Sequence, residues 1–113
     1  MLGSGAIIVM AEGTDMVKVL ANLSHFYAAE SCGQCTPCRE GTGWLARVLH
    51  RILHGQGRPG GLGLLATVAG HIGGRTICAL GDAAAMPVQS FLKHYRHEFQ
   101  HYIEHGRSLV VAA

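Results

Sequence analysis

Three cysteines lie close together in the segment ESCGQCTPCREGTGW, which spans residues 30–44. Cys32, Cys35 and Cys38 are separated by two residues each, and the only other cysteine is Cys78, in the segment GGRTICALGD. This C-x-x-C-x-x-C spacing is typical of a [4Fe–4S] cluster, because two intervening residues let a loop curl until three thiolates bind three irons of one cube. The fourth iron needs a thiolate from elsewhere, so we predict that Cys78 completes the ligand set.

The residues around these cysteines suit an anionic cluster. Gly33 permits the positive φ angle that a tight curl of the backbone demands. Cys38 is predicted at the start of a helix, where unpaired N–H groups and the helix dipole favour negative charge. Arg39 and Arg75 flank the two cysteine segments and would add compensating positive charge. These features agree with a cluster whose four thiolate ligands give it a net negative charge.

Other uses of four cysteines stay open from the pattern alone. A tetrahedral zinc ion is possible, although structural zinc sites usually offer two separated C-x-x-C pairs rather than three cysteines and one. A thioredoxin-like C-x-x-C motif would need a βαβ context, which the sequence does not show. A disulfide framework fits poorly, because the three clustered sulfurs have only one distant partner among them.

The length and composition of the chain limit its function classes. With 113 residues it is one small domain or a piece of a larger one, and a hydrophobic content of 49% is enough for a core. The formal net charge is only +2, with no basic run, so nucleic acid is a poor candidate partner. No apolar stretch reaches the roughly 18 residues of a membrane span, and none resembles a signal peptide. We therefore expect a cytoplasmic chain without direct membrane insertion, whose cysteines stay reduced.

The apolar periodicity predicts an all-α fold: a small antiparallel four-helix bundle with a cysteine loop, preceded by one short strand. The strand is expected at 6–10, which is rich in β-forming residues. Steps of three and four between apolar residues predict helices at about 15–30, 37–54, 62–72 and 87–105, and the short connections favour antiparallel packing. Thr14 or Asp15 would cap the first helix, Thr36 would cap the second with Pro37 in its first turn, and Pro87 would open the last.

Three further features are better explained by the fold than by ligand binding. The segment GQGRPG at 55–60 matches G-x-G-x-x-G, but it follows a predicted helix and contains Pro59, so we interpret it as a flexible loop. Trp44 and the aromatic residues of the last helix are interpreted as core or subunit contacts. Four histidines fall at steps of three and four on the last predicted helix; a surface metal patch is conceivable, but we favour a solvated polar face. They are His94, His97, His101 and His105.

The blocks ESCGQCTPCREGTGW and GGRTICALGDAAAMPVQSFLKHYRHEF together resemble the C-terminal iron–sulfur domain of the NADH-binding flavoprotein subunit of respiratory complex I. In bacteria this is the F subunit of NADH-quinone oxidoreductase. The resemblance extends from LGSGAIIVM to HYIEHG and so covers nearly the whole chain. It implies a small helical bundle and, matched by position, cluster ligands at Cys32, Cys35, Cys38 and Cys78.

The resemblance implies an electron relay rather than a catalytic site of acids and bases. In full-length family members NADH passes a hydride to FMN, and electrons then leave singly through a [4Fe–4S] cluster towards quinone. The implied partners are the other hydrophilic-arm subunits of complex I, namely two iron–sulfur subunits, one smaller and one larger than the flavoprotein subunit. The implied location is the cytoplasm, peripheral to the inner face of the cell membrane, or the mitochondrial matrix side in a eukaryote.

The chain departs from this family in its length. Family members are several times longer, and their glycine-rich FMN and NADH sites lie upstream of this region. We therefore expect a fragment, a wrongly assigned start or a split gene, which binds neither FMN nor NADH and is not catalytic alone. The expected organisation is the tail of a preceding domain at 1–12, a cluster-binding bundle at 13–106 and a C-terminal tail at 107–113.

Two alternatives to complex I stay open from the sequence. An NAD-reducing hydrogenase or an NAD-dependent formate dehydrogenase shares this module, although the RTICALGDAAAMPVQSFLKHYRHEF block is more similar to complex I. The other alternative is a non-redox bundle, with zinc or without metal, that docks to partner subunits. Metal analysis and EPR of anaerobically purified protein separate this last class from the first two.

Overall fold

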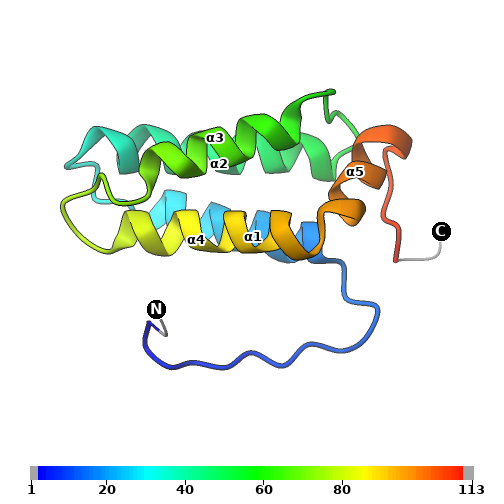
Figure 1. The fold of residues 1–113 in the computed structure, drawn as a ribbon, viewed down its shortest axis with the longest axis horizontal. Coiled ribbons are helices and arrows are strands. Elements are labelled where there is room, and N and C mark those ends of the chain that lie inside the picture. The colour runs from blue at the N-terminus through cyan, green and yellow to red at the C-terminus, as the bar shows by residue number, and fades with distance from the viewer. Residues whose placement is uncertain (1–2, 111–113) are drawn as a thin grey trace.

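Four helices run alternately in opposite directions and pack as a bundle, and a fifth, shorter helix lies at one end (Figure 1). The structure, a computed structural model, describes residues 3–110. The helices are α1 (Met16–Glu30), α2 (Thr36–Leu53), α3 (Gly61–Ile72), α4 (Leu80–His94) and α5 (Arg96–His105). The predicted all-α fold is therefore confirmed, whereas the described residues form five helices rather than four. Because neighbours alternate in direction, the α1–α2 and α3–α4 connections lie at the same end of the bundle.

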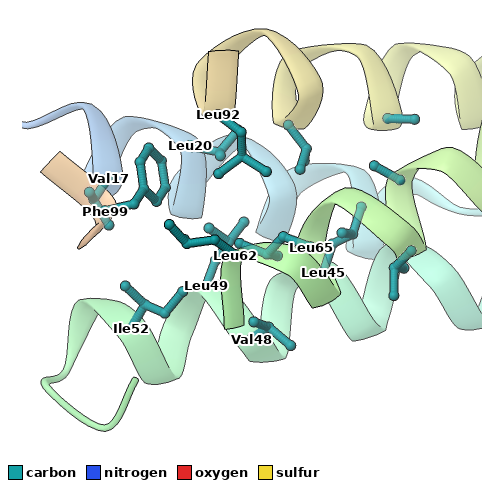
Figure 2. Packing of buried hydrophobic residues seen from close by; sticks show 14 of the residues in the cluster. Val17, Leu20, Leu45, Val48, Leu49, Ile52, Leu62, Leu65, Leu92 and Phe99 are labelled. Carbon is teal, nitrogen blue, oxygen red and sulfur yellow. The ribbon is translucent and has the colours of Figure 1, made fainter. Parts of the chain in front are cut away.

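The core lies between the helices and receives side chains from all five. On each helix the buried residues recur at steps of three and four, as an amphipathic helix requires. Figure 2 shows Phe99 of α5 next to Val17 of α1, so the last helix closes one end of the core. The buried cluster consists of Val17, Leu20, Leu45, Val48, Leu49, Ile52, Leu62, Leu65, Val68, Ala69, Ile72, Ala85, Val88, Leu92, Phe99 and Tyr102.

Two carboxylates from distant parts of the chain hold the start of α1. Asp15 is the N-cap, as predicted, and accepts hydrogen bonds from two backbone N–H groups of the first turn at 3.0 and 3.1 Å. Glu98 of α5 accepts a further bond from the Met16 N–H at 3.1 Å. The Tyr102 hydroxyl donates to Asp15 Oδ2 at 2.5 Å, and burial together with the Asp15 carboxylate raises the pKa of Tyr102 to about 12. This buried network ties α5 to α1.

Helices α2 and α3 approach each other closely at Gly41. A Cβ atom at this buried position would lie 2.6 Å from two carbons of the Ile72 side chain, at the end of α3. That distance is far inside van der Waals contact, so only glycine fits without a shift of its neighbour. Gly41 lies one turn after Cys38, and Ile72 immediately precedes the segment that carries Cys78. The contact therefore helps to fix one cysteine segment relative to the other.

The prediction of a strand at 6–10 is wrong, because no strand forms among residues 3–110. The segment follows an extended path outside the bundle (Figure 1), and its side chains are exposed, Ile7 by 88% and Val9 by 91%. A β-strand requires a neighbouring strand to pair with its N–H and C=O groups. β-Forming residues alone do not supply that neighbour.

The last predicted helix is also corrected, at its start and in its middle. α4 begins at Leu80, so Pro87 lies inside the helix rather than opening it. The alanines at 83–85 are strong helix formers and extend the helix ahead of the proline. The chain then turns at Tyr95 (φ −123°, ψ 21°), which separates α4 from α5. One predicted helix is thus two, and the turn lets Phe99 enter the core.

The remaining predicted helices are confirmed to within one residue at each end. At the start of α2 the N-cap is Cys35 rather than Thr36, although Pro37 does lie in the first turn. Residues 55–60 form a loop, as predicted. No helix in the described part of the chain is long and apolar enough to cross a bilayer.

Candidate iron–sulfur centre

The first three cysteines lie in the α1–α2 connection and in the first turn of α2. Cys32 is exposed, Cys35 is half-buried, and Cys38 is buried at 5% exposure. Gly33, between the first two, has φ of +76°, which confirms the predicted left-handed conformation. The backbone therefore makes the tight curl that a C-x-x-C-x-x-C ligand loop needs.

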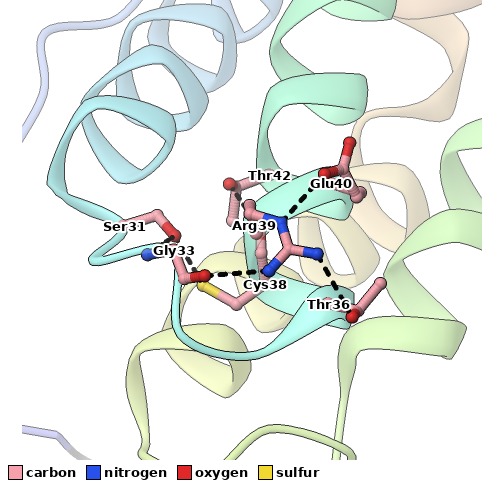
Figure 3. Close-up of polar contacts among 7 residues, drawn as sticks. All are labelled: Ser31, Gly33, Thr36, Cys38, Arg39, Glu40 and Thr42. Carbon is pink, nitrogen blue, oxygen red and sulfur yellow. Dashed lines mark hydrogen bonds and ion pairs between the residues drawn. The ribbon is translucent and has the colours of Figure 1, made fainter.

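Arg39 holds this curl in place (Figure 3). Its Nη1 donates to the carbonyl oxygen of Gly33 at 3.0 Å, and its Nη2 donates to Thr36 Oγ1 at 3.4 Å. Its Nε also pairs with Glu40 at 3.0 Å on the exposed surface. The positive charge of Arg39 thus lies at the cysteine loop, as the sequence predicts, and the neighbouring Glu40 carboxylate offsets part of it.

Two hydroxyl groups and the start of α2 surround Cys38. Its sulfur lies 3.2 Å from Ser31 Oγ, and Thr42 Oγ1 donates to the Cys38 carbonyl oxygen at 2.7 Å (Figure 3). α2 has no side-chain capping bond and no acidic residue in its first turn, so no carboxylate neutralises the positive end of the helix dipole there. Sequence reasoning missed Ser31 and Thr42, and their only sequence signal is a hydroxyl within one or two turns of the cysteines.

Cys78 lies in the 73–79 segment between α3 and α4, and it is exposed. Hydrogen bonds anchor this segment: Asp82 Oδ1 accepts from the Gly74 N–H at 2.7 Å, and Thr76 Oγ1 donates to the Cys78 carbonyl oxygen at 2.8 Å. Gly81 is buried in the first turn of α4, and a Cβ atom there would overlap the Thr76 side chain. The segment is therefore packed directly against α4 just beside Cys78.

Both cysteine segments lie at the same end of the bundle (Figure 1). A groove of about 350 Å³ joins this end of α2 to the end of α3, and Pro37 and Arg75 are among the residues that line it. Arg75 therefore lies near the start of α2, close to the first cysteine segment. The topology thus brings the single remote cysteine to the side of the molecule where the other three lie.

The four thiols are not gathered around a single point. All four cysteines are free, and within residues 3–110 no three His, Cys, Asp or Glu side chains are close enough together to hold a metal ion. In a four-iron cube each thiolate binds a different iron, so the ligand sulfurs are spread around the cube rather than around one atom. A donor set of four thiols at one end of the bundle fits such a cluster chemically, and the assignment of the ligands stays a prediction.

The histidines singled out in the last predicted helix lie away from this site, at the α5 end of the bundle. The predicted histidines are divided between two helices, with His94 at the end of α4 and the other three on α5. They are exposed except for the half-buried His101, whose ring stacks on His105 at 4.3 Å, in agreement with a solvated polar face. Trp44 is 46% exposed and lines the groove between α2 and α3, so it is not a core residue and its interpretation as a subunit contact stays a prediction, whereas Phe99 is buried in the core.

Comparison with known proteins agrees with the chemistry of the site. Residues 18–102 match the family described as the NADH-ubiquinone oxidoreductase-F iron-sulfur binding region. This match includes all four cysteines. The chain belongs to this family. The resemblance inferred from the two cysteine blocks is therefore confirmed.

Several bacterial relatives of this oxidoreductase-F family carry the same region. The F subunit of NADH-quinone oxidoreductase in Rickettsia bellii is 52% identical over 103 residues, which make up 91% of this chain and 25% of the relative. The F 1 subunit in Rhizobium meliloti is 50% identical over 103 residues, 91% of this chain and 24% of the relative. The F subunit in Rickettsia felis is 50% identical over 109 residues, 96% of this chain and 26% of the relative. The chain thus spans about a quarter of the length of these curated relatives.

Proposed function

We propose that this chain binds one [4Fe–4S] cluster through Cys32, Cys35, Cys38 and Cys78 and relays single electrons within an NADH-quinone oxidoreductase. The observation that carries the proposal is that both cysteine segments lie at one end of a bundle from an iron–sulfur binding family. When bound, a [4Fe–4S] cluster accepts and donates one electron at a time, at a potential that its surroundings set.

The residues around the loop would hold and tune such a centre. Ser31 Oγ, 3.2 Å from the Cys38 sulfur, can donate a hydrogen bond to a thiolate. That bond, the start of α2 and the guanidinium of Arg39 all stabilise added negative charge, so they favour the reduced state. Cys38 is buried while Cys32 and Cys78 are exposed, so one side of the site is open to an electron donor or acceptor.

The wider reaction is proposed for the longer proteins of the family. There, electrons would arrive from FMN reduced by NADH and continue towards quinone, with the smaller and the larger iron–sulfur subunits of the complex I hydrophilic arm as partners at the inner face of the membrane. In this chain the proposed organisation is a tail at 1–12, the bundle at 13–106 and a second tail at 107–113. Residues 1–2 and 111–113 of these tails lie outside the described residues.

Anaerobic reconstitution with iron and sulfide tests cluster binding directly. We expect about four irons and four acid-labile sulfides per chain, and an S = 1/2 EPR signal after reduction with dithionite. These results would distinguish a cluster from a mononuclear zinc site, which has no unpaired electrons. Stoichiometric zinc in the purified protein, with no cluster signal after reconstitution, would refute the proposal.

Replacement of the remote ligand tests the ligand assignment. Cys78→Ala should yield an unstable or three-iron centre, because only three thiolates then remain. Ile77→Ala is the matched control, since Ile77 is the preceding residue, is 78% exposed and has a side chain that cannot bind a metal. A full four-iron centre in Cys78→Ala would exclude Cys78 as the fourth ligand without excluding the cluster.

A further inference from the structure

A basic groove runs between α1 and α2, and the proposed cluster site does not use it. Two adjoining hollows of about 520 and 370 Å³ form it, and they share the lining residues His25, Ala46 and His50. We refer to these joined hollows as the α1–α2 groove. None of the four cysteines lines it, so its properties can be tested independently of cluster binding.

The charge of the α1–α2 groove is one-sided. Lys18, Arg47 and Arg51 line it and are exposed, which places three of the nine Lys and Arg residues of the chain in this groove. None of its lining residues, all of which the structure describes, is acidic. The surface is therefore locally much more positive than a chain with a formal net charge of +2 suggests.

Apolar side chains lie between and beside these charges. Ala21 and Ala46 are small and half-buried, Leu53 packs against the core at one end, and Trp44 is 46% exposed at the other. Leu53 lies nine positions after Trp44, about two and a half turns of α2, so the two side chains lie at opposite edges of the exposed face of this helix, and the two arginines lie between them. Trp and Arg are both enriched among the residues that contribute most to binding at protein interfaces.

We propose that the α1–α2 groove binds an acidic amphipathic helix of another polypeptide. The carboxylates of such a helix would pair with Lys18, Arg47 and Arg51, and its apolar face would cover Ala46 and the adjoining face of Trp44. Charge complementarity selects this occupant. Two other occupants fit less well. The same face of a second copy of the chain would place positive side chains opposite positive side chains, and a small inorganic anion would leave Trp44 exposed.

Trp44 is the only tryptophan of the chain, so its fluorescence reports on binding at its surface; it also lines the groove between α2 and α3, and the charge-reversed variants described next distinguish the two grooves. The probe is a synthetic peptide of Glu, Leu and Ala, roughly 16 residues long so that it can form a helix. Added to the full chain at low ionic strength, it should shift the emission of Trp44 to shorter wavelength, with saturation. Binding should weaken steeply with added salt, because charge pairs at an interface rim are screened.

Charge reversal in the groove supplies the decisive comparison. Arg47→Glu with Arg51→Glu should weaken peptide binding by about tenfold or more, because carboxylates then face carboxylates. Arg96→Glu with Arg107→Glu is the matched control: it makes the same change in net charge at exposed positions outside the groove, and it should bind almost as the unaltered chain does. Circular dichroism checks that each variant is folded, and the Gln pair at 47 and 51 replaces the Glu pair if that variant does not fold.

Four results would overturn the proposal: no shift of the Trp44 emission, equal losses in the groove and control variants, self-association of the chain through this face, or groove-dependent binding to phosphatidylserine vesicles without binding to the peptide. Each of these results would mean that the basic residues of the groove bind another partner or no partner. Loss of binding only in the groove variants supports it, whether or not the chain holds a cluster.

Discussion

Replacement of Gly41 by alanine tests whether the close approach of α2 and α3 is rigid. In an open helix position, glycine to alanine stabilises by about 1 kcal/mol because alanine has the higher helix propensity. At Gly41 the new methyl group would lie 2.6 Å from two carbons of Ile72, which is only 1% exposed and belongs to the buried core, so this side chain would have to shift. Forcing a methyl into a packed core costs about 1–3 kcal/mol, so we expect a net loss of about 1 kcal/mol or more in the free energy of unfolding.

Urea denaturation followed by circular dichroism measures this loss. Gly63→Ala and Gly70→Ala are matched controls on α3, because a Cβ atom at either position has nothing within 4 Å. Both should stabilise the chain, by about 0.5–1 kcal/mol. Ile72→Val in the Gly41→Ala background removes one clashing carbon and should recover part of the loss, a coupling that a double-mutant cycle isolates. If Gly41→Ala were as stable as the two controls, the inference of a fixed distance between α2 and α3 would be refuted.

Further predictions concern α5 and the Cys78 segment. Tyr102→Phe should lower the free energy of unfolding by about 1–3 kcal/mol in urea denaturation, because it leaves the buried Asp15 carboxylate without one donor. The same contact predicts that the folded chain loses stability at high pH, since the pKa of Tyr102 is about 12 in the folded chain against an ordinary value of 10.0. Below pH 10 the Tyr102 hydroxyl keeps its proton in the folded and in the unfolded chain, so its contribution to the free energy of unfolding is complete. This contribution is lost as the pH rises towards 12, by up to about 2–3 kcal/mol. Tyr102→Phe should not show this loss. Gly81→Ala should displace Thr76 and lower the iron content after reconstitution, whereas Gly70→Ala should not; an unchanged iron content would mean that the 73–79 segment tolerates the displacement.

Features that depend on neighbouring residues could be predicted from the sequence. The Asp15 cap, the bounds of α1 and α3 and the positive φ of Gly33 each follow from signals within a few residues. The tight cysteine loop could also be predicted, because the C-x-x-C-x-x-C spacing lies within seven consecutive residues. The common location of the two cysteine segments follows from the alternating helices alone.

Features that depend on distant contacts could not be predicted. Glu98 bonds to Met16 across 82 positions, and no local pattern marks either residue for that role. The turn at Tyr95 carries no glycine or proline, so a continuous apolar stripe hides the division of α4 from α5. Pro87 is a misleading signal, because helix formers before a proline can extend a helix ahead of it.

The alternating course of the helices has an entropic consequence. Cys38 and Cys78 are 40 positions apart along the chain, yet their segments share one end of the bundle. A cross-link over a loop of about 40 residues restricts the unfolded chain by about 4 kcal/mol. A centre bound by both residues would therefore cross-link the first half of the bundle to the second. A chelator that removed this centre would lower the melting temperature of the whole domain rather than loosen one loop.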